Sequence, residues 1–85
     1  MKMKVYRCKN KKLHRNNGPA VVLPNGSKFW YEYGMLHRED GPAIEYANGS
    51  KAWCLGGNSY IEKEYWQKLY KLGKITQEQL VLELL

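Results

Sequence analysis

The sequence predicts an α+β fold, in which an antiparallel meander of about five short strands is followed by one long and one short helix. The first observation is an internal repeat: residues 36–57 align with residues 13–34 without a gap, at an offset of 23. Repeats of this length are typical of stacked supersecondary units. The second observation is a change after Gly57, where apolar residues take helical spacing. The 85 residues suit one domain, with a hairpin-repeat sheet over 4–57 and a helical segment over 58–85.

Each copy has the pattern of a β-hairpin. Asn25-Gly26 and Asn48-Gly49 separate β-prone runs, and both residue types tolerate the positive φ of a tight turn. We therefore expect strands over 20–23, 28–33, 43–46 and 51–55. Shifted by 23, residues 5–8 fall on 28–31, which predicts a first strand over about 4–9 as half of an incomplete unit. A lone hairpin is marginally stable in water, so stacked copies give each one a neighbour.

A first helix is predicted over about 60–72. Ser59 and Glu62 have the spacing of a capping box at its start. Four apolar residues recur at helical steps, and we expect their face to cover one side of the sheet. They are Ile61, Tyr65, Leu69 and Leu72, and Trp66 and Tyr70 widen the face.

A second helix is predicted over 77–85, after Gly73 in a left-handed conformation and Thr76 as N-cap. It is very apolar for a chain end, where disorder is usual. One interpretation is that it packs on the first helix or the sheet. The other is a subunit or partner contact through Leu82 and Leu85, with a two-fold homodimer as the simplest form.

Aromatic residues dominate the returning strand of each hairpin. Trp30 and Trp53 occupy equivalent positions, and we expect them to form the buried spine of the sheet. Phe29, Tyr31 and Tyr33 alternate with Trp30 and therefore point to the opposite face. If the helix leaves that face open, these three residues are a candidate partner-binding surface.

The repeated His-Arg pairs, His14-Arg15 and His37-Arg38, have two interpretations. In the structural one, the imidazole binds the backbone of the linker and the arginine pairs with Asp40 or Glu39. In the functional one, the pairs form a row at one edge that faces a phosphate or a carboxylate.

The sequence predicts neither a metal site, nor a cofactor, nor an enzyme. Cys8 and Cys54 fall at the same repeat position two units apart, roughly 19 Å from each other. A disulfide needs Cα atoms about 4.4–6.8 Å apart, so two free thiols are expected. His14 and His37 would lie about 9.6 Å apart, without a metal-binding spacing. No serine has a plausible His–acid partner for nucleophilic catalysis.

The net charge of +6 arises in the first 15 residues, which contain seven basic residues and no acid. The basic arm, represented by Lys9, Lys11, Lys12 and Arg15, is interpreted as a solvated strand edge or as an electrostatic contact. Because Tyr6 lies among these cations, nucleic-acid binding by the arm and an aromatic sheet face is the alternative function. Nothing amphipathic accompanies the arm, so no membrane contact is expected.

The residues of the second copy that carry a family resemblance are Leu36, His37, Arg38, Asp40, Gly41, Pro42, Ala43, Gly49 and Trp53. With their counterparts in the first copy, they resemble the MORN repeat, in a variant found in uncharacterised bacterial and bacteriophage proteins. The resemblance implies a scaffold or a protein- or lipid-contact surface. Together with the small size, the missing catalytic set and the repeat, it favours a non-catalytic protein-interaction module. By analogy it also implies a phage-encoded modulator or inhibitor of a host or defence protein. With no signal peptide and no apolar run long enough to span a membrane, we expect a cytoplasmic location, in the host if phage-encoded.

Overall fold

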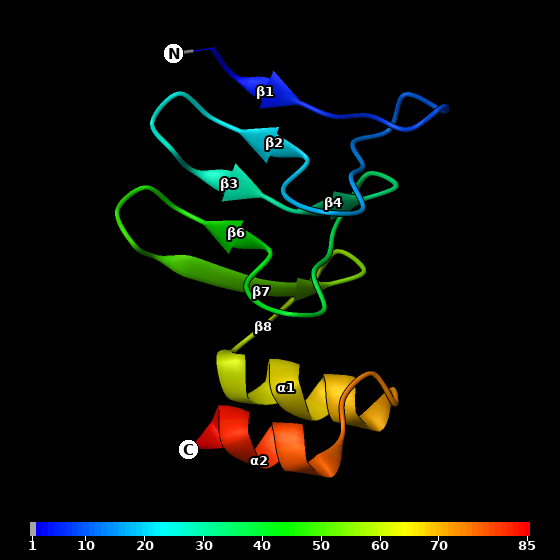
Figure 1. The fold of residues 1–85 in the computed structure, drawn as a ribbon, viewed down its shortest axis with the longest axis vertical. Helices are drawn as coiled ribbons and strands as arrows, with labels where there is room; N and C mark the ends of the chain where they lie inside the picture. Colours follow the sequence, from blue (N-terminus) through cyan, green and yellow to red (C-terminus); the bar gives the residue numbers. More distant parts are fainter. Residues whose placement is uncertain (1) are drawn as a thin grey trace.

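The computed structural model describes residues 2–85 and has the predicted α+β class (Figure 1). An antiparallel sheet of six short strands is followed by two helices, and a two-stranded sheet lies beside it. The six strands, in spatial order, are β1 (Lys4–Val5), β2 (Val21–Val22), β3 (Lys28–Phe29), β6 (Ile44–Glu45), β7 (Lys51–Leu55) and β8 (Asn58–Tyr60). The pair is β4 (Tyr31–Glu32) and β5 (Met35–Leu36), and the helices are α1 (Glu62–Lys71) and α2 (Gln77–Leu84).

The two complete hairpins have the same register. Val21 pairs with Phe29 in the first, and Ile44 pairs with Ala52 in the second, so both partners shift by 23. Each hairpin turns at an Asn-Gly pair, where the glycine has positive φ: 94° at Gly26 and 92° at Gly49. The local turn chemistry thus sets the register that the repeat predicts.

The first, incomplete unit follows an offset of 24 instead of 23. The Tyr6 N–H donates to the Ala20 carbonyl at 2.8 Å, and the Trp30 N–H donates to the Ala43 carbonyl at 2.8 Å, so Tyr6 is the equivalent of Trp30. The predicted alignment of residues 5–8 with 28–31 is therefore wrong by one residue. The cause is a longer loop, since five residues separate the bridged pair Arg7 and Leu13, whereas four separate the equivalent pair 31 and 36.

This shift also means that Cys8 and Cys54 are not at equivalent positions. Cys54 lies in β7 at the place that Tyr31 takes one unit earlier, whereas Cys8 lies one residue beyond the corresponding place. Both are free thiols, as the sequence predicts, with Cys54 buried and Cys8 partly exposed.

Two local predictions are wrong because cross-strand pairing overrides them. The predicted strand 28–33 divides into β3 and β4, since Tyr31 pairs with Leu36 in the two-stranded sheet. Ser59 does not begin a capping box. It lies in β8 opposite Cys54, and Ile61 is the N-cap of α1 without a side-chain hydrogen bond.

Helix α1 packs against β7 and β8 at the end of the sheet rather than covering one side of it (Figure 1). Its buried side chains are Tyr65, Trp66 and Leu69, whereas Ile61 and Leu72, expected on the same face, are exposed. The reason is Trp53. Its ring centroid lies 5.1 Å from that of Tyr65 and 5.8 Å from that of Trp66, so the helix turns its aromatic side toward the last hairpin.

Helix α2 begins as predicted, because the Thr76 hydroxyl accepts a hydrogen bond from the Gln79 N–H at 3.1 Å. Gly73, with φ of 73°, ends α1 in the left-handed conformation. The two helices pack on each other, and Leu80 reaches the core cluster. That cluster consists of Leu55, Tyr65, Trp66 and Leu69, with Trp53, Tyr60, Ile75 and Leu80 packed against it.

A buried serine links the two Asn-Gly turns. The Ser27 hydroxyl, 3 % exposed, accepts a hydrogen bond from the Ala47 N–H at 3.0 Å. The first turn has Pro24 at the position of Ala47 and so has no N–H that needs such a partner. Ser50, the equivalent of Ser27 in the second hairpin, is exposed.

We expect Ser27→Ala to lower the free energy of unfolding by about 1 kcal/mol, because it leaves the Ala47 N–H without its partner. Ser50→Ala is the matched control and should change it by less than about 0.5 kcal/mol. Urea unfolding of both variants measures the difference. Equal effects would show that the two turns are not linked through Ser27.

Candidate functional site

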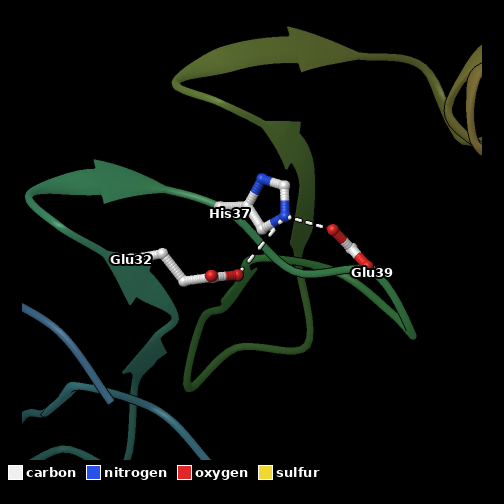
Figure 2. A group of neighbouring side chains, drawn as sticks. All are labelled: Glu32, His37 and Glu39. Carbon is white, nitrogen blue, oxygen red and sulfur yellow. Dashed lines mark hydrogen bonds and ion pairs between the residues drawn. The ribbon is translucent and has the colours of Figure 1, made fainter. Parts of the chain in front are cut away.

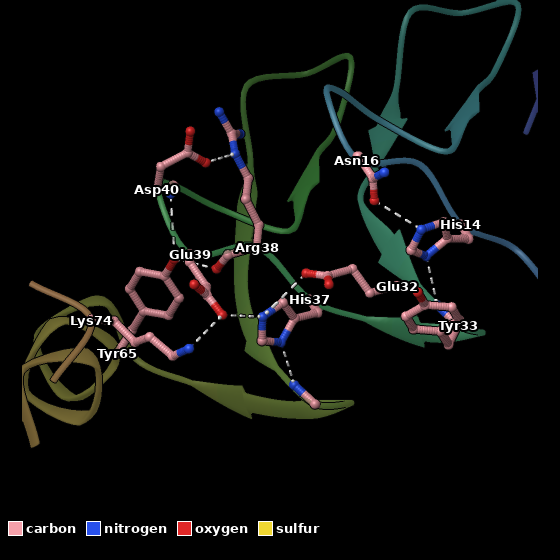
Figure 3. A network of polar contacts seen from close by, with 12 residues as sticks. His14, Asn16, Glu32, Tyr33, His37, Arg38, Glu39, Asp40, Tyr65 and Lys74 are labelled. Atoms are coloured by element: carbon pink, nitrogen blue, oxygen red, sulfur yellow. Dashed lines mark hydrogen bonds and ion pairs between the residues drawn. The ribbon is translucent and has the colours of Figure 1, made fainter. Parts of the chain in front are cut away.

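The histidines of the two linkers perform the same task (Figure 3). His14 Nδ1 accepts a hydrogen bond from the Tyr33 N–H at 3.1 Å, and His37 Nδ1 accepts one from the Gly56 N–H at 2.9 Å. Each ring therefore binds the backbone of the following tight turn, 19 residues further along, and not the backbone of its own linker. Because Nδ1 accepts in both rings, the proton of the neutral imidazole lies on Nε2.

The arginines cover an aromatic ring in each unit. The Arg15 guanidinium carbon lies 4.0 Å from the Tyr6 ring centroid, and that of Arg38 lies 3.9 Å from the Trp30 centroid. Each guanidinium also donates to the carbonyl of the linker proline, Pro19 at 3.3 Å or Pro42 at 3.0 Å. Stacking of this kind contributes about 0.5–2 kcal/mol. Each guanidinium is thus held over an aromatic ring and bonded to the carbonyl of its own linker.

Among the salt bridges of residues 2–85, the acidic partners gather around the second linker. Arg38 Nε lies 2.8 Å from Asp40 Oδ1, and its Nη1 lies 3.1 Å from Glu45 Oε2. Of the two partners that the sequence suggests for Arg38, Asp40 is the one that it contacts. Arg15 in the first copy has neither, because Asn17 and Val22 occupy the corresponding positions.

The His37 cluster consists of Glu32, His37, Glu39 and Lys74 (Figure 3), and Figure 2 shows the histidine with its two glutamates. His37 Nε2 lies 2.9 Å from Glu39 Oε2 and 3.3 Å from Glu32 Oε2. Lys74 Nζ approaches the same Glu39 oxygen at 3.8 Å. The cluster joins the end of β4, the second linker and the loop between the helices.

The donor atoms of Glu32, His37 and Glu39 lie within 4.8 Å of one another, which is close enough to hold a metal ion. The hydrogen bonds do not fit that use. A metal-ligating histidine donates its other ring N–H to an acceptor, whereas Nδ1 of His37 faces the Gly56 N–H. Binding an ion at Nε2 would move the proton to Nδ1 and place two N–H groups against each other. The cluster is better suited to hydrogen bonding between neutral His37 and the two carboxylates.

Tyr65 ties helix α1 to the second linker. Its hydroxyl donates to the Arg38 carbonyl and accepts from the Gly41 N–H at 3.3 Å. The side chain is fully buried, and burial raises the pKa of Tyr65 to about 12. Helix α1 therefore holds the second linker, which carries His37, Arg38 and Asp40, in addition to the contacts of its own hairpin.

The candidate partner-binding residues do not form one surface. Phe29 and Tyr31 are half-buried, and Phe29 packs edge-to-face on Tyr46 with centroids 6.2 Å apart. Tyr33 is exposed in the turn after β4, and its ring lies 4.1 Å from that of His14. Leu82 and Leu85 are 62 % and 94 % exposed at the opposite, helical end of the molecule (Figure 1).

The basic arm divides by exposure. Lys9, Lys11 and Lys12 are exposed in the loop before Leu13, and Lys11 has a positive φ of 64°. Lys12 packs its aliphatic stem near Gly34, so this loop lies beside the turn that carries Tyr33. Arg15 differs from these lysines, because its guanidinium lies on Tyr6.

The network also contains Glu32, Glu45 and Lys74, which were not predicted from the sequence, and Tyr65, which was predicted only as part of the apolar face of the first helix. A comparison of the two copies contains a signal for one of them, because Glu45 replaces Val22 near the linker residues Glu39 and Asp40, which replace asparagines. Tyr65 and Lys74 come from the helical segment, and no spacing in the sequence connects them to the second linker.

The fold and the contacts define a class, namely a small α+β protein of stacked β-hairpins closed at one end by two helices. Comparison of the chain with protein-family models, curated proteins and solved structures gave no match. The resemblance to MORN repeats stays a prediction. Among residues 2–85, no helix is both long and apolar enough to cross a membrane.

We expect His37→Ala to lower the free energy of unfolding by about 0.5–1.5 kcal/mol, because the exposed Gly56 N–H and two carboxylates exchange His37 for water. His37→Asn should lose less, since the asparagine oxygen can replace Nδ1 as the acceptor for Gly56. Urea unfolding measures both. Stabilisation of the native chain by zinc that disappears in His37→Asn would instead assign the cluster to a metal.

We expect the alkaline loss of stability to depend on Tyr65. Its folded pKa of about 12 lies above the ordinary tyrosine value of 10.0, so the unfolded chain releases this proton at lower pH than the folded chain does. Its contribution is therefore constant below pH about 10 and is lost as the pH rises toward about 12, by up to roughly 2–3 kcal/mol. Tyr65→Phe should remove this part of the decline and lower the free energy of unfolding at neutral pH by about 1–3 kcal/mol.

Tyr70→Phe, in an exposed position, is the control. The measurement is urea unfolding of both variants across this pH range. An equal pH dependence of the two variants would contradict the role given to Tyr65.

Proposed function

We propose that the chain is a small non-catalytic module that binds another protein. The observation that carries this proposal is that α2 and the residue after it have more apolar side chains than the fold buries. Leu80 packs against the core, while Val81, Leu82, Leu84 and Leu85 are exposed. Exposed apolar residues grouped on one element are typical of interaction surfaces.

The surface hollows agree with binding rather than catalysis. Three of them have volumes of about 320, 340 and 380 Å³ and are lined mostly by charged side chains. A small-molecule site is usually an apolar cleft with a few convergent polar groups. The titratable groups that do converge, in the His37 cluster, hydrogen-bond one another and the backbone. They support the proposal of a scaffold whose polar groups hold the hairpins together.

Nucleic-acid binding is the second candidate, and one observation favours it. Lys9, Lys11 and Lys12 are exposed in one loop beside the turn of Tyr33, whose ring is also exposed. Cations next to an accessible aromatic ring suit a single-stranded nucleic acid, whose bases stack on aromatic rings. A homodimer through α2, a role as a phage-encoded modulator and a cytoplasmic location stay predictions.

We expect Leu82→Glu combined with Leu85→Glu to reduce partner capture at least about tenfold while changing the free energy of unfolding by less than about 0.5 kcal/mol per residue, because both side chains are exposed. The measurement is recovery of the partner protein from a nuclease-treated lysate of the source cells. Met35→Glu, at an exposed apolar residue far along the chain from α2, is the matched control.

Two outcomes would contradict this function. Capture that disappears on nuclease treatment, and that Lys9→Ala, Lys11→Ala and Lys12→Ala abolish, would assign the chain to nucleic acid. Capture that the leucine variants leave unchanged would remove α2 as the contact. Light scattering of the same variants tests the homodimer, since a dimer through α2 should become a monomer.

A further inference from the structure

We propose that the outer edge of β1 is a docking site for an extended acidic peptide, which adds to the sheet as an antiparallel strand. The proposal rests on the proposed function of protein binding and names a second contact, at the other end of the molecule from α2. The two ends of the stack differ: β8 packs against α1, whereas among residues 2–85 β1 has one neighbouring strand, β2 (Figure 1).

The repeat shows what this edge is shaped to accept. β1 is the equivalent of β3 at the offset of 24, so Val5 corresponds to Phe29. In β3, the Phe29 carbonyl accepts a hydrogen bond at 2.8 Å from the Ala20 N–H, at the start of the neighbouring strand. The corresponding edge of β1 has no strand beside it among residues 2–85.

The hydrogen-bonding groups at this edge follow from the pairing with β2. Lys4 is opposite Val22, and the Tyr6 N–H donates to the Ala20 carbonyl. Backbone groups of an antiparallel strand alternate in direction. The N–H and C=O of Val5, between Lys4 and Tyr6, therefore point away from β2 and toward solvent. An added strand would pair with them without disturbing the existing sheet.

The side chains at the edge select the composition of that strand. Lys2, Lys4 and Tyr6 alternate with Met3 and Val5, so two lysines and a tyrosine lie on one face and two apolar residues on the other. Met3 is 55 % exposed and Val5 is 37 % exposed, and no acid lies within the first 15 residues to neutralise the lysines. A peptide that alternates acidic and apolar residues complements both faces.

A second copy of this chain is a poorer occupant. Two β1 strands paired antiparallel would bring Lys2 and Lys4 of one copy against the same lysines of the other, and like charges directly opposite are destabilising. Lysine on an edge strand opposes self-association for this reason. The same charges attract an acidic strand, so the edge discriminates between the two.

The test uses a labelled, end-blocked peptide of alternating Glu and Val, about eight residues long, with the native chain. Fluorescence anisotropy of the peptide should show binding, and this binding should weaken as the salt concentration rises. Hydrogen exchange of the Val5 amide should be slower in the complex than in the free chain. Lys2→Glu combined with Lys4→Glu should weaken binding at least about tenfold. Lys63→Glu, an exposed charge reversal on α1, is the control and should change it less than about twofold. A peptide with proline at its centre should bind at least about tenfold more weakly, since proline cannot donate to the ladder.

Equal binding of the proline peptide, or protection that appears at α2 instead of Val5, would overturn the proposal. So would protection of Val5 in the free chain that grows with protein concentration, because it would assign the edge to a second copy. Binding of a single-stranded oligonucleotide without binding of the peptide would assign the arm to phosphate. Loss of peptide binding leaves the test of Leu82 and Leu85 unaffected, so the two contacts fail or succeed separately.

Discussion

Each hairpin unit leaves one aromatic ring that the next segment of chain must cover, and the structure depends on how this is done. Arg15 covers Tyr6 and Arg38 covers Trp30. Trp53 is covered by Tyr65 and Trp66 of α1. Because the helix takes the place of a further linker, it ends the stack at the last hairpin. The Tyr65 hydroxyl completes this connection by binding the Arg38 carbonyl and the Gly41 N–H of the previous linker.

The parts of the fold that local chemistry determines could be predicted from the sequence. The Asn-Gly turns set the register of both hairpins, and Thr76 and Gly73 set the start and end of helices through backbone groups close to them in sequence. Ser59 shows the limit. Its spacing to Glu62 satisfies a local rule, but its pairing with Cys54 in β8 depends on a strand that no periodicity marks. The offset of the first unit was missed for a related reason, since one extra loop residue changes the register without changing any motif.

Only part of the candidate site could be predicted from the sequence, and the reason is physical. A repeated His-Arg pair predicts a shared structural task, and both pairs have one. The partners of the pair come from elsewhere: Gly56 lies in the next turn, and Lys74 and Tyr65 lie in the helical segment. Such contacts arise only after the chain is stacked. They occupy polar groups that the two copies share, whereas the two proposed contacts lie at the ends of the molecule, on β1 and α2.

Those ends are separated by the long dimension of the molecule. The principal extents are 39 × 31 × 19 Å, and β1 and α2 lie at opposite ends of the longest (Figure 1). An extended strand advances about 3.3 Å per residue, so a peptide paired with β1 would need about a dozen further residues to reach α2. One short segment therefore cannot serve both contacts. A partner that engages both must supply an acidic strand and an apolar surface from separate parts of its own fold, and the weaker contact then gains from the effective concentration that the stronger one creates.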